Sequence, residues 1–195
     1  MKTGIVILAA GNSSRLGRCK QLLQHQGCTL LKKTATICIE SEAHPVIVVL
    51  GADYDECVLE LQNLKLHLRY NPRYPEGIST SIHAGLDALL NLDPDVDAAI
   101  FCLCDQPYLT TDFLNEMITT FEASDSEIIA ASYANTIGSP ALFAKKYFPE
   151  LYQLRGDQGA RKLLLREEIN MVKIPFPKGE EDIDTVEDYE RLIAG

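Results

Sequence analysis

Short apolar runs alternate with helical patterns along the whole chain. Most of the apolar runs are continuous, which is typical of strands that are covered on both faces of a sheet. The runs that predict strands are Thr3–Ala10, Pro45–Gly51, Leu64–Asn71, Ala98–Cys104, Glu127–Ala134 and Asn170–Pro175.

The segments between these runs have helical periodicity. In the segment Thr80–Leu92, the residues Ile82, Leu86, Leu89 and Leu90 form one apolar stripe. The alternation of strand and helix predicts an α/β fold, a doubly wound, mostly parallel (Rossmann-like) sheet with helices on both faces, formed by residues 1–195 as a single domain. The predicted helices are Thr29–Ala43, Asp53–Gln62, Thr80–Leu92 and Thr111–Ala123, and the predicted irregular segments are Asn71–Ser79, Tyr133–Ser139 and Lys178–Asp184.

Composition and charge exclude several classes of protein. The chain has 195 residues and a formal net charge of −10, without a basic stripe, which argues against nucleic acid as a partner. Its six cysteines show no CxxC pair, so we expect reduced, mostly structural thiols. No apolar stretch approaches the ~20 residues that span a bilayer. We therefore expect a cytoplasmic protein with no membrane partner.

The loop after the first strand carries the first candidate chemistry. It runs from Leu8 to Lys20 through small residues, whose backbone N–H groups could hold phosphates together with Arg15 and Lys20. Neither GxGxxG nor the P-loop pattern is present. Taken alone, the segment also fits an ordinary turn between strand and helix with surface cations.

This segment resembles the LAAGxSxRxGxxK loop of the nucleotidyltransferases, and of the molybdenum cofactor cytidylyltransferases in particular. The resemblance implies that the loop wraps a nucleoside triphosphate and that Arg15 and Lys20 are catalytic cations. The matching residues are Leu8, Ala9, Ala10, Gly11, Ser13, Arg15, Gly17 and Lys20.

Two acidic motifs are candidates for a magnesium site. Asp105 follows the fourth predicted strand and precedes Gln-Pro, where it could cap a turn or bind Mg²⁺. It resembles the family's metal-binding aspartate, which also contacts the nucleotide. The segment starting at Asp182 resembles the family's DIDTxEDY run, which implies Asp184 as the second metal ligand and Asp182 as a weaker candidate.

The same acidic run predicts the start of a helix. Thr185 and Asp188 form a capping-box pattern, and the apolar stripe expected to be buried is Val186, Tyr189 and Ile193.

A third loop opens the helix of Ile82. Ser79 or Thr80 could cap that helix, and its N-terminus would also suit an anion or a base edge. The family's G-x-S/T-x-S segment contacts nucleobase and sugar, which implies this role for Gly77, Ser79 and Ser81.

Two later motifs concern the second substrate. The segment starting at Gly138 is similar to the family's GHPVLF, with Ser139 in place of histidine, and the segment starting at Gly156 matches GDxGAR. Asp157 is predicted to cap the next helix, and Arg161 could bind an anionic acceptor. Ser139, Arg161 and Asp182 are therefore the candidate acceptor-binding residues.

The resemblance implies a Mg²⁺-dependent enzyme that transfers CMP from CTP to molybdopterin and releases pyrophosphate. Its product would then pass to a molybdoenzyme. The methyl group of Ala10 stands where guanylyl-transferring relatives have glycine, which favours a pyrimidine base. The alternatives are a cytidylyl-, uridylyl- or guanylyltransferase for a sugar or polyol phosphate, and a nucleotide-binding regulator without turnover.

Overall fold

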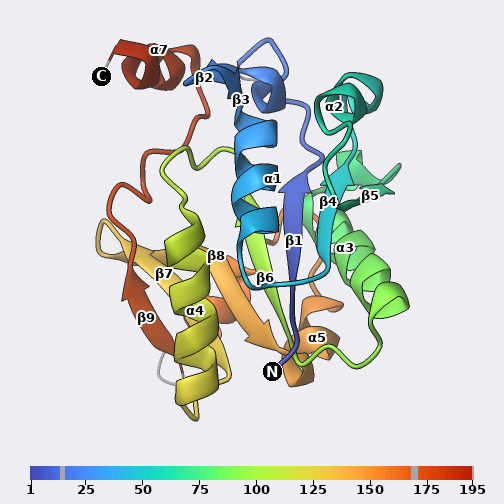
Figure 1. Cartoon of the computed structure of the whole chain (residues 1–195), viewed down its shortest axis with the longest axis vertical. Helices are drawn as coiled ribbons and strands as arrows, with labels where there is room; N and C mark the ends of the chain where they lie inside the picture. Colours follow the sequence, from blue (N-terminus) through green and yellow to red (C-terminus); the bar gives the residue numbers. More distant parts are fainter. Residues whose placement is uncertain (14–15, 168–170, 195) are drawn as a thin grey trace.

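A central sheet organises the chain, and the computed structural model describes residues 1–13, 16–167 and 171–194 (Figure 1). In the described part this sheet has seven strands in the order β5-β4-β1-β6-β8-β7-β9. The pairs of β1 with β4 and β6, of β4 with β5 and of β7 with β9 are parallel, whereas β8 runs antiparallel to β6 and β7. The strands are β1 (Thr3–Ala9), β4 (Val46–Leu50), β5 (His67–Tyr70), β6 (Ala98–Leu103), β7 (Ile128–Tyr133), β8 (Thr136–Ala144) and β9 (Val172–Pro175).

Helices cover both faces of the sheet, as expected. On β1, Ile5 and Ile7 pack with α1, α2 and α4, while Val6 and Leu8 face α3, α5 and α6. Figure 1 shows α1 and α4 in front of the sheet and α3 and α5 behind it. Because both faces are covered, β6 is apolar at every position and β1 is apolar from Gly4 onward. The helices are α1 (Leu30–Glu40), α2 (Tyr54–Glu60), α3 (Ile78–Leu92), α4 (Thr111–Ala123), α5 (Phe148–Leu151), α6 (Arg161–Arg166) and α7 (Val186–Ala194).

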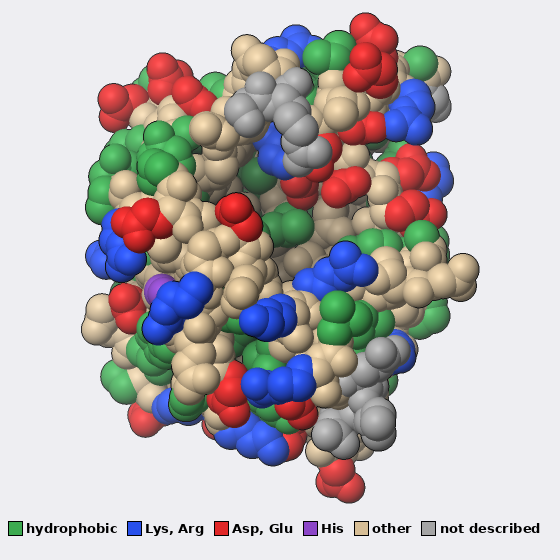
Figure 2. Space-filling view, turned by 180° about the vertical axis from the view of Figure 1, so that it is seen from behind, with side chains coloured by type: hydrophobic (Ala, Val, Ile, Leu, Met, Phe, Trp, Pro, Cys, Tyr) green, Lys and Arg blue, Asp and Glu red, His purple; other side chains and the backbone are tan. Residues whose placement is uncertain are grey.

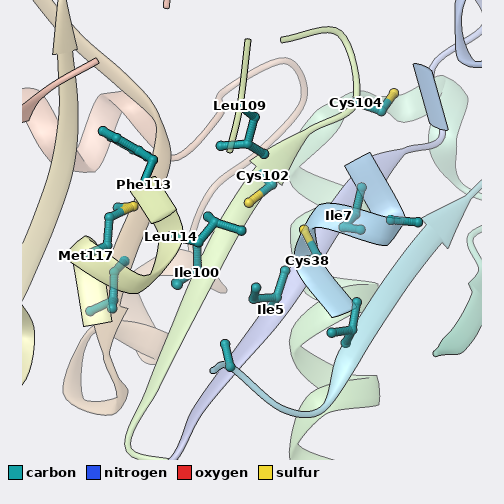
Figure 3. Packing of buried hydrophobic residues seen from close by; sticks show 14 of the residues in the cluster. Ile5, Ile7, Cys38, Ile100, Cys102, Cys104, Leu109, Phe113, Leu114 and Met117 are labelled. Atoms are coloured by element: carbon teal, nitrogen blue, oxygen red, sulfur yellow. The ribbon is translucent and has the colours of Figure 1, made fainter. Parts of the chain in front are cut away.

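Cysteines contribute to the packed layer beneath α1 and α4. Figure 3 shows Cys38 of α1 and Cys102 of β6 among the aliphatic side chains of this layer. All six cysteines are free thiols. The prediction of reduced, largely structural thiols therefore agrees with the structure for the buried ones.

The predicted irregular segment Tyr133–Ser139 is wrong. β7 continues to Tyr133 and β8 already begins at Thr136, so only Ala134 and Asn135 form the turn. Both turn residues have positive φ, 45° and 60°, which matches the right-handed twist of a two-residue hairpin. The strand was not predicted because β8 contains Gly138 and Pro140, residue types that are typical of turns.

Smaller differences concern the ends of elements. The helix predicted to start at Thr80 begins at Ile78, and the predicted strand Leu64–Asn71 shortens to β5 at the exposed edge of the sheet. Of the strand predicted over 170–175, the structure forms Val172–Pro175, and Asn170 lies outside the described residues.

The last helix packs on a small hairpin, β2 (Gln24–His25) with β3 (Cys28–Thr29). The Tyr189 hydroxyl donates a hydrogen bond of 2.9 Å to the carbonyl oxygen of Gln24. Leu192 is buried and Tyr189 packs partly buried against the same cluster, whereas Val186 and Ile193 are exposed, so the predicted buried stripe is wrong at Val186 and Ile193. The helix covers a small cluster rather than the sheet, so few of its apolar positions are buried.

The parallel pairing of β1 with β6 decides where function is to be sought. Their carboxyl ends lie at the same edge of the sheet, which brings the loop after Ala9 beside the residues after Leu103. In open α/β sheets this edge is where ligands bind. Within the described residues, no helix is long and apolar enough to cross a membrane.

Candidate active site

Gln21 holds the loop after β1 in place. Its side-chain amide donates hydrogen bonds of 3.0 and 2.9 Å to the carbonyl oxygens of Ala9 and Gly11. Its Oε1 accepts from the hydroxyl of Ser13 and from the thiol of Cys19. Because Gln21 is almost completely buried, these bonds replace water at backbone groups that would otherwise be unpaired.

Gln21→Ala should therefore lower stability and loosen the loop at the same time. The buried carbonyl group of Ala9 and the part-buried one of Gly11 lose their donor, and we expect a loss of about 2 kcal/mol in the free energy of unfolding. Thermal unfolding of the purified variant measures this loss. The control is Gln24→Ala, whose side chain is exposed and which should unfold like the unmodified protein. Equal unfolding temperatures for both variants would contradict the role of Gln21.

Ser13 and Lys20 are linked within this loop. The Ser13 hydroxyl accepts a hydrogen bond of 3.0 Å from the backbone N–H of Lys20, and Ser13 has a positive φ of 48°. Ser13 does not line the nearby cavity, so in this structure it shapes the loop rather than facing a ligand. Arg15, the other predicted cation, lies outside the described residues.

Lys20 brings the two predicted metal ligands together. Its Nζ lies 2.5 Å from Asp105 Oδ2 and 3.1 Å from Asp184 Oδ1, across 85 and 164 residues of sequence. Burial alone would lower the pKa of Lys20, but the carboxylate of Asp105 outweighs burial, with a further contribution from Asp184, and the pKa lies above its usual value. Lys20 is therefore charged at neutral pH. Around its ammonium group the fold brings together the carboxylates of Asp105 and Asp184.

The residues at this point suit a divalent cation. Asp105 Oδ1 is buried and has no hydrogen-bond partner among the described residues, although a buried carboxylate oxygen normally has one. Burial and the charges of Asp105 and Asp184 raise the pKa of Asp182, but within the described residues no group of three or more His, Cys, Asp or Glu side chains is placed to hold a metal ion. Carboxylate oxygens are the ligands that Mg²⁺ prefers, with its remaining positions left to water and phosphate. Asp105 and Asp184 would hold such an ion.

A cavity of about 380 Å³ opens beside Lys20 and Asp105, and its size suits a small ligand. Figure 2, seen from the side of α3, shows the surface hollowed near its centre, with acidic side chains above the hollow and basic ones below it. Its lining combines the charged side chains of Lys20 and Asp105 with apolar surfaces, which come from Leu8, Leu103, Tyr74, Pro75 and Ile78.

The start of α3 forms one wall of this cavity. Asn71, buried at the end of β5, donates to the hydroxyls of Thr80 and Ser81 at 2.9 and 3.0 Å. Ser81 lines the cavity, and its oxygen accepts from Asn71 while none of the described residues accepts its proton, so the hydroxyl can donate to a ligand. Ser79 faces a different cavity beside His83, so α3 turns Ser79 away from Ser81. Neither Ser79 nor Thr80 caps α3, because Gly77 occupies that position.

Gly77 joins this wall to the loop before α6. Its φ is 109°, and a Cβ atom there would lie 2.2 Å from the backbone carbon of Gly156. The backbone N–H of Ser79 donates to the Gly156 carbonyl oxygen at 3.1 Å, which fixes the contact. Asp157, which follows Gly156, lines the cavity and does not cap α6, contrary to the prediction.

Gly77→Ala is expected to cost at least about 2 kcal/mol in unfolding free energy, because positive φ and a backbone clash add together. Gly159→Ala is the matched control, since its nearest neighbour would lie 3.7 Å from the new methyl group. Urea unfolding of both variants measures the difference, and similar midpoints would refute the proposed contact.

The predicted acceptor residues lie outside the lining of the cavity. Gln106 donates hydrogen bonds to the carbonyl oxygens of Ser139 at 2.9 Å and Gly179 at 3.2 Å, which ties β8 to the residue after Asp105. Arg161 is exposed at the start of α6 and donates to the Thr136 hydroxyl at 2.7 Å. Ser139 is therefore linked to the carboxylate site, and Arg161 is held on the β7–β8 hairpin.

Sequence reasoning missed the residues that brace the site. Gln21, Asn71 and Tyr74 were not singled out, although each lines or supports the cavity. Asn71 had a signal, because it is a polar residue directly after a strand. The sequence contains no such signal for Gln21, because its role depends on hydrogen bonds to the loop carbonyl groups of Ala9 and Gly11.

Comparison with known proteins places the chain in a family. The model of the MobA-like NTP transferase domain matches residues 5–171. The chain belongs to this family. It is therefore a nucleotidyltransferase, in agreement with the resemblance carried by the loop after β1.

Curated relatives of this MobA-like transferase have different names. Purine catabolism protein PucB of Bacillus subtilis (strain 168) is 29% identical over 96% of this chain and 94% of PucB. Nicotine blue oxidoreductase of Paenarthrobacter nicotinovorans is 28% identical, with 96% and 95% of the two chains covered. Molybdenum cofactor cytidylyltransferase of Escherichia coli (strain K12) is 24% identical, with 94% and 92% covered.

Solved structures share the whole fold. Rv0371c from Mycobacterium tuberculosis H37Rv is 26% identical with a TM-score of 0.85, covering 100% of this chain and 99% of that one. The same protein has been solved as a complex with manganese, with a TM-score of 0.82 and full coverage of both chains. The α/β nucleotidyltransferase fold of this chain is thereby confirmed.

Proposed function

We propose that this MobA-like transferase uses Mg²⁺ and transfers CMP from CTP to molybdopterin with release of pyrophosphate. The observation that carries the proposal is the position of Lys20 between Asp105 and Asp184, beside a cavity whose lining is partly charged and partly apolar. Such a lining suits a nucleotide, whose base would contact the apolar side chains and whose phosphates would lie near Lys20.

Each part of the site has a chemical task in this scheme. An oxygen of the acceptor phosphate forms a bond to the α-phosphorus of CTP while the bond to the β-phosphate oxygen breaks. Bound Mg²⁺ would neutralise charge on the triphosphate. Lys20 stabilises the negative charge of the leaving pyrophosphate, and Gln21 keeps the loop that carries Lys20 in position. The acceptor needs no general base, because a phosphate oxygen is already ionised at neutral pH.

Base choice rests on Ala10, which is buried and lines the cavity. Ala10→Gly removes a methyl group from the wall, so we expect the ratio of CTP to GTP turnover to fall about tenfold, the size of effect that one methyl group gives in a pocket. Initial rates of pyrophosphate release with each nucleotide measure it. An unchanged ratio would show that Ala10 does not select the base.

The acceptor is tested by offering several phosphates. Purified enzyme is incubated with CTP and Mg²⁺ plus molybdopterin, a sugar phosphate or a polyol phosphate, and pyrophosphate is measured. Release that depends on molybdopterin supports the proposal. Release with a sugar or polyol phosphate alone would move the reaction to that acceptor, an alternative favoured by Ser139 in place of histidine.

The cellular assignments follow from this proposal. We propose a cytoplasmic enzyme whose product passes to a molybdoenzyme, without nucleic acid or a membrane as partner. Binding without any turnover, for every acceptor tested, would support a regulator instead.

A further inference from the structure

A second cavity lies behind the wall that the start of α3 forms in the active site. Segments 73–81 and 155–157 contribute residues to both cavities. Ser81 and Asp157 line the active-site cavity, whereas Ser79 and Gly156 line the second one. The second cavity has a volume of about 320 Å³, and its lining includes Arg73, Glu76, Ser79, His83, Tyr152 and Arg155.

Ser79 presents a buried hydroxyl group to this second cavity. The residue is 1% exposed, and its backbone N–H donates to the Gly156 carbonyl oxygen at 3.1 Å. No described residue forms a hydrogen bond with the hydroxyl group, although buried polar side chains normally have a partner. The hydroxyl of Ser79 is therefore available to a ligand in the cavity.

Positive charge faces the same space. The Nη1 atom of Arg155 donates to the carbonyl oxygens of Tyr152 and Leu154 at 2.7 and 2.8 Å, which holds the side chain in place. Its other N–H groups have no carboxylate partner among the described residues. Ser79 lies in the first turn of α3, a helix of 15 residues whose N-terminal end carries the positive end of the helix dipole. The cavity therefore favours an anion.

The carboxylates near the cavity are already engaged. Glu76 accepts two hydrogen bonds from Arg73, at 3.0 and 2.7 Å. Asp87 accepts one from the Tyr152 hydroxyl at 2.7 Å. Neither carboxylate is paired with Arg155, whose charge is left for a ligand.

We propose that this second cavity binds a phosphate group through the guanidinium group of Arg155 and the hydroxyl group of Ser79. A guanidinium group can donate two parallel hydrogen bonds to phosphate oxygens, and the serine hydroxyl donates a third. The phosphate is either inorganic phosphate or part of a small phosphate monoester, because the volume exceeds that of the ion itself.

A phosphate at this position would brace the active site from behind. It would join α3 to the loop before α6 across the contact of Gly77 with Gly156, and the same loop carries Asp157 into the active-site cavity. We therefore expect phosphate in the second cavity to favour nucleotide binding in the first. This coupling rests on the proposed function, whereas the binding of phosphate does not.

His83 provides a reporter for the site. It lines the second cavity one helical turn after Ser79, and its Nε2 atom lies 3.1 Å from the Leu151 carbonyl oxygen. NMR signals of the four histidine rings are followed at constant, mildly alkaline pH while sodium phosphate is added, with sodium chloride at equal ionic strength as the blank. We expect a saturable shift of the His83 signal, with the other three unchanged. No saturable shift, or equal shifts of all four signals, would overturn the proposal.

Glycerol 3-phosphate is titrated in the same way to separate the two sources of phosphate. Saturation at a lower concentration than with inorganic phosphate assigns the site to a monoester. Saturation at a higher concentration assigns it to the free ion.

Variants locate the bound phosphate. Arg155→Gln and Ser79→Ala should each weaken the response of His83 at least about tenfold, because each removes a hydrogen bond to a charged group. Arg69→Gln, on the exposed strand β5, is the control and should respond like the unmodified protein. Thermal unfolding shows whether each variant is folded, and Ser79→Ala should be as stable as the unmodified chain because its hydroxyl has no protein partner. A response that Lys20→Met abolishes and Arg155→Gln leaves intact would place phosphate in the active-site cavity and refute the proposal.

The coupling is measured by titrating CTP with Mg²⁺ in the presence and absence of phosphate. We expect phosphate to tighten CTP binding at least about fivefold in the unmodified protein and to have no such effect in Ser79→Ala. Unchanged or weaker CTP binding at saturating phosphate would refute the coupling. A His83 response without CTP binding would refute the proposed function alone, whereas CTP binding without a His83 response would refute this inference.

Discussion

Replacing Asp105 with asparagine is expected to slow pyrophosphate release by on the order of 10²–10³-fold, the size of effect seen when one preorganised charge contact is removed from an active site. Asparagine keeps the size of the side chain but removes the charge that faces Lys20 at 2.5 Å. It also places a neutral amide where the buried and unpartnered Oδ1 now lies. Steady-state rates at saturating nucleotide and Mg²⁺ measure the change.

Asp95→Asn is the control for this variant, because Asp95 is exposed in the turn before β6, whereas Asp105 follows the other end of that strand. Its turnover should equal that of the unmodified enzyme. Thermal unfolding shows whether Asp105→Asn remains folded. Unchanged turnover in a folded Asp105→Asn protein would contradict the role given to this carboxylate.

Replacing Lys20 with methionine should have a comparable effect on turnover and an additional effect on stability. The variant leaves Asp105 and Asp184 close together without their shared cation. Removing one partner of a largely buried ion pair costs about 2–3 kcal/mol, somewhat below the range for complete burial, because the Asp184 side chain keeps 32% of its surface exposed. We expect Mg²⁺ to recover most of this loss, since the ion can neutralise the same carboxylates.

Thermal unfolding with and without Mg²⁺ separates the two effects of this substitution. Lys32→Met, on the exposed side of α1, is the control and should show neither the loss nor the recovery. A Lys20→Met protein as stable as the unmodified chain, or one that Mg²⁺ does not stabilise, would show that Lys20 does not neutralise a cation site.

The fold could be predicted from the sequence wherever a local pattern is caused directly by burial. β6, and β1 from Gly4 onward, are apolar at every position because helices cover both faces, and the stripe of α3 is buried as its spacing predicts. β8 was missed because Gly138 and Pro140 interrupt its pattern, although its neighbours in the sheet accommodate both. Tertiary packing overrode local propensity there.

The site was predictable only in part, for a similar reason. Asp105 and Asp184 could be proposed from motifs, and the structure brings both to Lys20, but their use as metal ligands remains to be tested. The roles of Gln21 and Gly77 depend on contacts between segments that are distant in sequence or fold back on themselves, and no periodicity encodes such contacts. The opposite directions of Ser79 and Ser81 follow from the pitch of α3, once its start at Ile78 is known.

The central claim is that this cavity binds a nucleoside triphosphate through a divalent cation. Calorimetric titration of the reduced protein with CTP, GTP, ATP and UTP, each with and without Mg²⁺, and with NADH for comparison, tests it most directly. We predict that CTP binds most tightly, that its binding requires Mg²⁺, and that Asp105→Ala weakens it. Absence of metal-dependent binding for all four nucleotides, or tighter binding of NADH, would contradict the claim.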